Sequence, residues 1–210
     1  MEASAPVHPR IEPEPPEWQP RATWVGARLL CGAAAFFFVS FVFAFFYLKS
    51  LDLNKSWRIG HNVHPSIGLG VTIVVVLIIS GVLLWLASRR PATSLALGGG
   101  ALALALAAVV LQCIQYAKLG FGPANGAYAS VYVGWTATYT VFLLFCAYWI
   151  ETQVASIWRM RRGDVQRAVE AGVPAPDEVL ADAGLRACSF FWTFYVLIGV
   201  IAFVVLYLIK

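Results

Sequence analysis

The sequence predicts an all-α protein that crosses a membrane five times. Its 210 residues are 60% hydrophobic and only 12% charged, whereas charged residues make up about a quarter of a typical water-soluble domain. Five apolar stretches of the chain are each long enough for a helix to span the hydrocarbon core of a bilayer, which takes about 20 residues. Charged residues, glycines and prolines separate these stretches. Lipid is therefore the expected solvent for most of the chain.

Residues 1–23 are predicted to form a cytoplasmic tail, and residues 24–210 a single membrane domain. The tail is polar, holds six prolines and lacks the apolar stretch of a signal peptide. We expect it to be extended or disordered, or to lie against a partner protein. The first span, 24–48, has phenylalanines around much of its circumference, so some of these rings should face lipid or another protein.

The second span is predicted over 67–87 and the third over 93–117, with a charged turn between them. In the third span Gly99, Ala103 and Ala107 recur every four residues. Small residues at this spacing predict a helix face on which a neighbouring helix packs closely. Near the end of the same span, Gln112 and Gln115 either bond to a neighbouring helix or line a water path, and we favour the contact between helices.

The fourth span is predicted over 128–150, after a glycine-rich turn, and the fifth over 187–209. A cytoplasmic loop, 151–186, joins them. Its first part, 156–170, could continue the fourth helix into water until Pro174 and Pro176 end it, and Asp177 could cap a short following turn.

Basic residues are distributed unevenly between the two predicted sides of the membrane. Ten lie in the tail, at the start of the first span and in the second and fourth loops: Arg10, Arg21, Arg28, Arg89, Arg90, Arg159, Arg161, Arg162, Arg167 and Arg186. Five lie on the other side: Lys49, Lys55, Arg58, Lys118 and Lys210. The amino terminus is therefore predicted in the cytoplasm and the carboxyl terminus outside. The net charge is +4, but the basic residues lie at the ends of the apolar stretches, where they meet lipid headgroups. We therefore expect no nucleic-acid partner.

The predicted spans carry no ionisable residue deep in the membrane, where such residues mark ion paths or redox sites. The histidines, His8, His61 and His64, and both methionines lie outside the spans. The spans thus offer no axial ligands for a haem. His61 and His64 form a His-x-x-His pair, but two imidazoles are too few for a metal site, and we favour an interfacial loop. We predict no catalytic, metal-binding or cofactor-binding residue in this chain.

Four short segments, one in or beside each of the first, third, fourth and fifth predicted spans, carry a resemblance to a known family. They are Ala44-Phe-Phe-Tyr47, Leu111-Gln-Cys-Ile-Gln-Tyr116, Gly126-Ala-Tyr-Ala-Ser-Val-Tyr132 and Ser189-Phe-Phe-Trp-Thr-Phe194. In their order, spacing and helix positions they resemble subunit III of the haem–copper oxidases, the cytochrome c and quinol oxidases, in its five-helix bacterial form. The similarity covers nearly everything from Ala27 to the end of the chain.

The sequence departs from this family at the family's polar positions. Gln115 stands where the family usually has glutamate, and Ala33 and Ala34 stand where it usually has a Ser-Glu pair. The family's histidines and aspartate of the last two spans align with Tyr139, Phe142, Thr193 and Val196. The resemblance therefore implies the helix scaffold of the family. It does not imply a role of these positions in binding lipid headgroups or in proton uptake.

The resemblance implies a non-catalytic accessory subunit of a bacterial respiratory terminal oxidase in the plasma membrane. Haem and copper would lie in its partners, subunit I above all, together with subunit II and other respiratory subunits. Residues expected to contact helices, subunits or lipids are Gly99, Ala103, Ala107, Gln112, Gln115, Tyr116, Tyr128, Ser130, Phe191 and Trp192. One alternative is a subunit III-like component of another haem–copper enzyme, such as a nitric oxide reductase. A small transporter is a further alternative, although transporters usually have broken helices or polar groups at the midplane.

Overall fold

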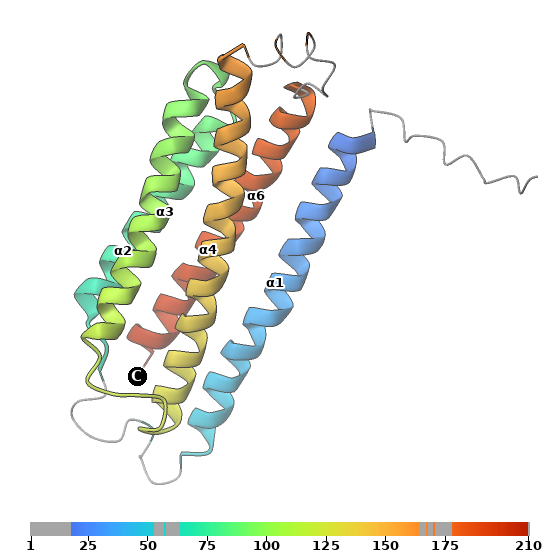
Figure 1. The fold of residues 1–210 in the computed structure, drawn as a ribbon. Coiled ribbons are helices and arrows are strands. Elements are labelled where there is room, and N and C mark those ends of the chain that lie inside the picture. The colour runs from blue at the N-terminus through green and yellow to red at the C-terminus, as the bar shows by residue number, and fades with distance from the viewer. Residues whose placement is uncertain are drawn as a thin grey trace, which may run out of the picture.

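The structure is a computed structural model that describes residues 18–52, 57, 64–163, 167, 170 and 178–209. Within these ranges the chain forms the long helices α1 (Trp18–Ser50), α2 (Ile67–Ala87), α3 (Ser94–Ala117), α4 (Ala127–Arg161) and α6 (Glu178–Phe203). A short turn of helix, η1 (Pro91–Thr93), precedes α3, and a π-helical segment, η2 (Val204–Leu208), continues α6. The long helices lie side by side as a bundle (Figure 1).

In the described part of the chain, five helices are long and apolar enough to cross a membrane. The predicted all-α, multi-pass membrane fold is therefore confirmed. The bounds of α2 match the predicted span, whereas three other helices are longer than predicted. Apolar length marks the thickness of the hydrocarbon core, and a helix can continue beyond it into the headgroups and water.

These extensions correct three predicted boundaries. Residues 18–23, which the sequence analysis assigns to the tail, belong to α1. The fourth helix continues to Arg161, in agreement with the expected extension into the loop. The last helix begins at Glu178 rather than at 187. The proposed helix end at Pro174 and Pro176 and the cap at Asp177 lie outside the described residues.

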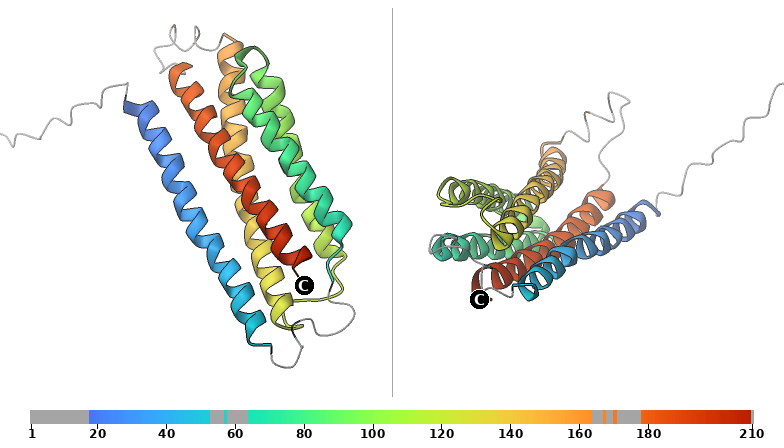
Figure 2. Two further views of the ribbon diagram at one scale, coloured as in Figure 1. Left: turned by 180° about the vertical axis from the view of Figure 1, so that it is seen from behind. Right: turned by 90° about the horizontal axis from the view of Figure 1, so that it is seen from below.

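Helix α6 packs against α1, α2 and α4. The remaining contacts pair α2 with α3, α3 with α4 and α1 with α4. Seen from below, α1 lies at the edge of the bundle beside α6 (Figure 2). This edge position leaves much of α1 uncovered: Phe36 is 85% exposed and Phe43 is 67% exposed, whereas Phe38 and Phe45 are buried. As expected, this chain leaves some of these rings uncovered; their contact with lipid or with a partner stays a prediction.

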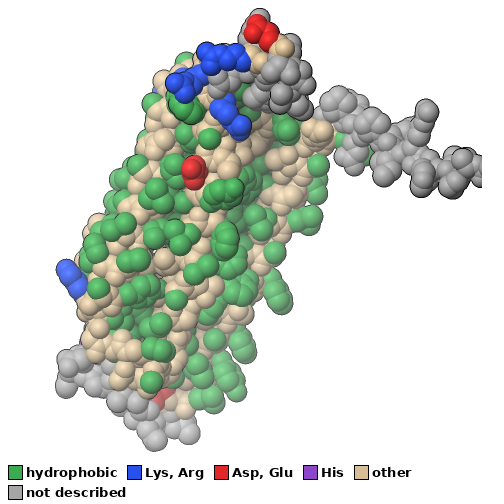
Figure 3. Space-filling model, viewed as in Figure 1, with side chains coloured by type: hydrophobic (Ala, Val, Ile, Leu, Met, Phe, Trp, Pro, Cys, Tyr) green, Lys and Arg blue, Asp and Glu red, His purple; other side chains and the backbone are tan. Residues whose placement is uncertain are grey.

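Lys and Arg side chains gather at one end of the bundle, at the top of Figure 3. This basic end contains the first turns of α1, α3 and α6 and the last turns of α2 and α4. The described chain begins there, and its carboxyl end lies at the opposite end of the bundle (Figure 1). Below, these are called the basic end and the carboxyl end.

Arg161, in the last turn of α4, holds the turn between α2 and α3. Its guanidinium Nη2 donates to the carbonyl oxygens of Pro91 and Ala92, the latter at 3.0 Å, and lies 3.3 Å from Ser94 Oγ. A planar guanidinium with several N–H groups can bond to more than one carbonyl at once. Charge counting groups Arg161 with the other arginines of the basic end, but it does not reveal this contact.

Replacing Arg161 by glutamine is expected to loosen the α2–α3 turn and to lower the free energy of unfolding by about 1 kcal/mol. Hydrogen exchange should be faster at the Thr93 amide, which donates to Arg90 O at 3.1 Å. Arg159→Gln is the matched control, because it removes the same charge from the same turn of α4. Equal exchange rates in the two variants would show that the guanidinium contact does not hold the turn.

Candidate functional site

A buried cluster of hydrogen-bonded side chains joins three helical segments at the carboxyl end. Gln115 Nε2 of α3 donates to the hydroxyl of Tyr132 on α4 at 2.8 Å, and also to the hydroxyl of Tyr207 on η2. The two hydroxyl oxygens are 2.7 Å apart and share a hydrogen bond. Tyr132 and Gln115 are buried. The prediction that Gln115 bonds to a neighbouring helix is therefore confirmed.

Tyr128 joins α4 to the end of the chain in a different way. Its hydroxyl donates to the carbonyl oxygen of Leu206 at 2.7 Å. The last carbonyls of a helix lack partners within the helix, so this bond satisfies an acceptor that would otherwise be costly to bury. Tyr128 is fully buried, as is the adjacent Tyr132 ring.

An aromatic chain leads from α1 to this cluster. The ring of Trp57 lies edge-on to Phe45 of α1 at 5.3 Å and to Tyr128 of α4 at 5.9 Å. The Trp57 backbone N–H donates to Asp52 Oδ2 at 2.9 Å, which fixes the position of this residue beside α1. Segments that are far apart in the sequence thus meet in one place: the end of α1, the end of α3, the start of α4 and η2.

A second aromatic group, nearer the basic end, joins α4 to α6. The rings of Tyr139 and Tyr195 are stacked, with centroids 4.5 Å apart and planes at 9°. Each hydroxyl donates to the backbone carbonyl of the other residue, Tyr139 at 3.1 Å and Tyr195 at 2.6 Å. Phe38 of α1 lies edge-on to both rings. This pair therefore links the two helices through stacking and through reciprocal hydrogen bonds.

Phe191 and Trp192 extend the second group along α6. Both are buried within this chain, and both rings stack on Tyr195, at 6.1 Å and 6.3 Å. Phe191 also contacts Trp149 of α4 at 5.8 Å. Both side chains therefore pack against helices of this chain. A contact of Phe191 or Trp192 with another subunit or with lipid stays a prediction. Ser130, by contrast, is exposed, and its hydroxyl donates to the carbonyl of Pro123 in the preceding turn.

The close-packing face of α3 differs from the predicted one. A Cβ on Gly99 would meet nothing within 4 Å in the described structure, and Ala103 is exposed. The buried small residues are Gly98, Ala101, Ala105 and Ala108. A helix turns once in 3.6 residues, so a strict spacing of four drifts around its circumference, whereas alternating steps of three and four stay on one face. Contact of Gly99, Ala103 and Ala107 with another subunit or with lipid stays a prediction.

Two polar side chains of α3 lie beside the cluster without a bond to it. Gln112 is 7% exposed, and its Nε2 has no hydrogen-bond partner in the described structure. The Tyr116 hydroxyl is in the vicinity of Gln112, Thr136 and Thr140, yet it reaches no hydrogen-bond geometry with any described residue. Gln112 Nε2 therefore does not make the predicted hydrogen bond to a neighbouring helix within the described structure.

Tyr132, Trp135, Tyr195 and Tyr207 were not among the predicted contact residues, although the spacing of aromatic residues in α4 pointed to two of them. Tyr128, Tyr132, Trp135 and Tyr139 follow one another at intervals of four, three and four residues. This spacing keeps all four on one face of a helix, and in a membrane span it predicts a buried aromatic face. No comparable spacing pointed to Tyr207, because its contacts depend on where α6 ends.

Gly70 marks the closest approach of α2 to η2. A Cβ at this position would lie 2.7 Å from Cε1 of Tyr207 and 3.1 Å from Cε2 of Phe203. Because the Tyr207 hydroxyl is held by Gln115 and Tyr132, the ring cannot move away without weakening those bonds. The absence of a side chain at Gly70 thus allows the cluster to form.

Gly70→Ala is expected to lower the free energy of unfolding by about 1–3 kcal/mol, the usual cost of overpacking. Gly68→Ala is the control on the same helix, since a Cβ there would meet nothing within 4 Å among the described atoms. It should be neutral or slightly stabilising, because alanine favours helix more than glycine does. Unfolding in mixed micelles with increasing SDS measures both variants, and equal effects would contradict the proposed contact.

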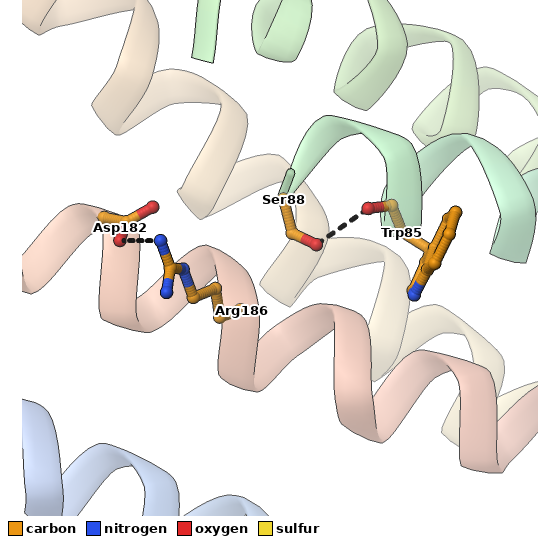
Figure 4. A network of polar contacts seen from close by, with 4 residues as sticks. All are labelled: Trp85, Ser88, Asp182 and Arg186. Atoms are coloured by element: carbon orange, nitrogen blue, oxygen red, sulfur yellow. Dashed lines mark hydrogen bonds and ion pairs between the residues drawn. The ribbon is translucent and has the colours of Figure 1, made fainter. Parts of the chain in front are cut away.

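At the basic end, aromatic and charged side chains border a hollow of about 1,020 Å³ over α6, between α1 and α2. The Arg89 guanidinium lies over the ring of Trp85 at 4.1 Å. On α6, Arg186 pairs with Asp182 at 2.9 Å, and Ser88 Oγ, directly after α2, donates to Trp85 O at 2.8 Å (Figure 4). Tryptophan and arginine together are typical of the membrane–water interface.

Among the described residues, no three His, Cys, Asp or Glu side chains come together as a possible metal site. His64 is exposed, and His61 lies outside the described residues, so the predicted interfacial loop stays a prediction. No protein-family model matches the sequence, and no curated protein matches it significantly. The resemblance to subunit III therefore rests on the four segments described above.

Proposed function

We propose that this chain is a non-catalytic accessory subunit, similar to subunit III, of a bacterial haem–copper terminal oxidase. One observation supports this proposal above all. Of the four segments that carry the resemblance, three meet at the carboxyl end: Phe45 contacts Trp57, which contacts Tyr128, and Gln115 bonds to Tyr132.

The proposed role is to hold the catalytic subunit in the membrane by packing against it. The uncovered surface of the bundle suits this role, because it combines large rings with small side chains. Phe36 and Phe43 project from α1, while Gly99 and Ala103 leave room on α3 for another helix. Helices in a membrane associate through this kind of close packing, since lipid supplies no hydrophobic driving force between them.

In the proposed orientation the basic end faces the cytoplasm of a bacterium and the carboxyl end faces outward. The concentration of arginines at one end supports this orientation through the preference of basic residues for the cytoplasmic side. Arg89 and Arg186 beside the hollow on α6 would contact the headgroups of membrane lipids. Haem and copper would belong to subunits I and II and to other respiratory partners.

Purification of the tagged chain in a mild detergent from its native membrane tests the proposal. We expect a large complex that contains haem and copper, reduces oxygen and shows the visible spectrum of a haem–copper oxidase. A colourless protein that purifies alone and moves solutes in liposomes would overturn the proposal in favour of a transporter. A complex that reduces nitric oxide in place of oxygen would instead support the alternative haem–copper enzyme.

A variant at the uncovered surface makes this experiment sharper. Ala103→Trp places a large ring on the exposed face of α3, so it should reduce the yield of co-purified haem without changing the unfolding of the isolated chain. Val141→Trp on α4 is a control of the same kind, because Val141 is 52% exposed on a different helix. Equal haem yields from the two variants would exclude the α3 face as the contact.

A further inference from the structure

We propose that the hollow over α6, between α1 and α2, binds an anionic phospholipid in the leaflet at the basic end. The hollow has a volume of about 1,020 Å³, and α6 runs between α1 and α2 when the bundle is seen from behind (Figure 2, left). Its lining is charged at the rim and apolar further along α6, which is the pattern that an amphipathic ligand requires. The site is independent of the proposed oxidase function, because it depends only on the membrane fold of this chain.

The rim of the hollow carries an excess of positive charge. Arg89, just after the end of α2, and Arg186 of α6 both line it, and both are exposed. Arg186 is paired with Asp182 at 2.9 Å (Figure 4), whereas Arg89 makes no ion pair with any described residue. None of the described residues that line the hollow is acidic. Basic pockets between membrane helices bind the headgroups of anionic lipids, because a guanidinium bonds well to phosphate oxygens.

Two tryptophans hold arginines on the two walls of the hollow. Trp85 of α2 and Trp24 of α1 both line it. The Arg89 guanidinium lies over the Trp85 ring at 4.1 Å, and the Arg28 guanidinium lies over the Trp24 ring at 5.7 Å. A guanidinium that stacks on a ring keeps the N–H groups at its edge free for a phosphate. Because tryptophan rings settle at the level of the headgroups, these arginines are placed where a lipid phosphate lies.

The rest of the hollow suits an acyl chain. Phe190, Phe194 and Leu197 line it along α6, and Phe190 and Leu197 are 42% and 54% exposed. Leu197 comes eleven residues after Arg186, which is about 16 Å along a helix that rises 1.5 Å per residue. One leaflet contributes about 15 Å to the hydrocarbon core. The hollow therefore extends over the depth of one leaflet, with the arginines at the headgroup end.

Other ligands match this lining less well. A free phosphate ion would bond to the arginines but would make no use of the apolar part. A zwitterionic lipid brings an ammonium group, and no carboxylate lines the described part of the hollow, since Asp182 lies outside it and is paired with Arg186. A neutral apolar molecule would leave the arginines without a counter-charge. An anionic phospholipid matches both the charged rim and the apolar floor.

Native mass spectrometry of the purified full chain tests the headgroup preference. Phosphatidylglycerol and phosphatidylcholine with identical acyl chains are added in turn, and we expect a lower dissociation constant for phosphatidylglycerol. Arg89→Gln should raise this constant about fivefold, since a basic residue at a membrane surface contributes about 1 kcal/mol. Arg162→Gln is the matched control, because Arg162 lies over Trp158 at 4.4 Å at the same basic end but does not line the hollow. It should leave the constant unchanged.

A variant in the apolar part distinguishes a lipid from a free anion. Thr193 is exposed and lines the hollow, so Thr193→Trp should obstruct the acyl chain and weaken the binding of phosphatidylglycerol. Ile201→Trp is the control on the same helix, because Ile201 is 41% exposed and does not line the hollow. Inorganic phosphate, which has no acyl chain, should not displace the bound lipid.

Circular dichroism checks that each variant is folded, and Arg186→Gln takes the place of Arg89→Gln if the latter is not. Equal dissociation constants for the two lipids, or equal effects of Arg89→Gln and Arg162→Gln, would overturn the proposal. Displacement of the lipid by inorganic phosphate, or a folded Thr193→Trp variant that binds as well as the unchanged chain, would also overturn it. The haem content of the purified protein reports on the proposed function alone, so the two proposals can fail separately.

Discussion

Replacing Tyr195 by alanine is expected to lower the free energy of unfolding by about 3 kcal/mol. The substitution removes a fully buried ring that stacks on Tyr139 at 4.5 Å and contacts Phe191, Trp192 and Phe38. It also removes the hydrogen bond to Tyr139 O at 2.6 Å. We expect the lower end of the range for buried aromatic residues, because a ring released into lipid loses packing but is not exposed to water.

The measurement is unfolding of the purified chain by SDS in mixed micelles, followed by tryptophan fluorescence and circular dichroism. Tyr148→Ala is the matched control, since Tyr148 is 66% exposed on α4 and should change stability by no more than about 0.5 kcal/mol. Equal losses for the two variants would contradict the claim that the Tyr139–Tyr195 pair joins α4 to α6.

Phenylalanine substitutions separate stacking from hydrogen bonding in this pair. Tyr139→Phe and Tyr195→Phe each keep a ring and remove one hydroxyl. Because each accepting carbonyl lies within a regular helix, where the backbone already satisfies it, each change should cost only about 0.6–1.7 kcal/mol. A cost for Tyr195→Phe as large as for Tyr195→Ala would assign the stabilisation to the hydroxyl rather than to the ring.

The second large effect is expected from Tyr132→Ala, also at about 3 kcal/mol. Tyr132 is fully buried, and its ring contacts Phe121, Tyr128 and Tyr207. Its hydroxyl is bonded to both Gln115 and Tyr207. The alanine variant should therefore release η2 from α3 and α4. Hydrogen exchange at the Ile209 amide, which donates to Val204 O at 3.1 Å, should become faster together with the loss of stability.

A double-mutant cycle of Tyr132→Phe and Gln115→Leu isolates the hydrogen bond between these two side chains. We expect a coupling free energy of about 0.6–1.7 kcal/mol, the range of hydrogen bonds between helices in membranes. The control cycle pairs Tyr132→Phe with Tyr148→Phe, which should be additive within about 0.5 kcal/mol. A coupling no larger than in the control would show that Gln115 and Tyr132 do not stabilise each other.

Gln115 shows how far the family resemblance extends and where it stops. The resemblance places a glutamate at this position, and a carboxylate at a site that is 1% exposed would be costly to ionise. The amide that this chain carries instead donates to two tyrosine hydroxyls, which a carboxylate could not do. The amide of Gln115 therefore serves the packing of α3 against α4 and η2.

Much of the membrane fold could be predicted from the sequence because apolar length is a local property. Twenty consecutive residues decide whether a segment can span the hydrocarbon core, and the bounds of α2 agree with the predicted 67–87. Helix ends outside the membrane were less predictable, as in α1 and α6, because a helix that leaves the lipid is no longer marked by hydropathy. The predicted packing face of α3 was wrong, because residues spaced strictly by four drift around a helix that turns once in 3.6 residues.

The sequence alone determined that five segments of this chain are long and apolar enough to cross a membrane and where its basic residues lie between them, since both follow from the order of residues along the chain. Tertiary structure decided which side chains meet. Gln115, Tyr132 and Tyr207 form one cluster, because the rotations of α3 and α4 and the place where α6 ends bring them together. Those rotations are set by close packing among all the neighbouring helices at once, which no single segment of sequence contains.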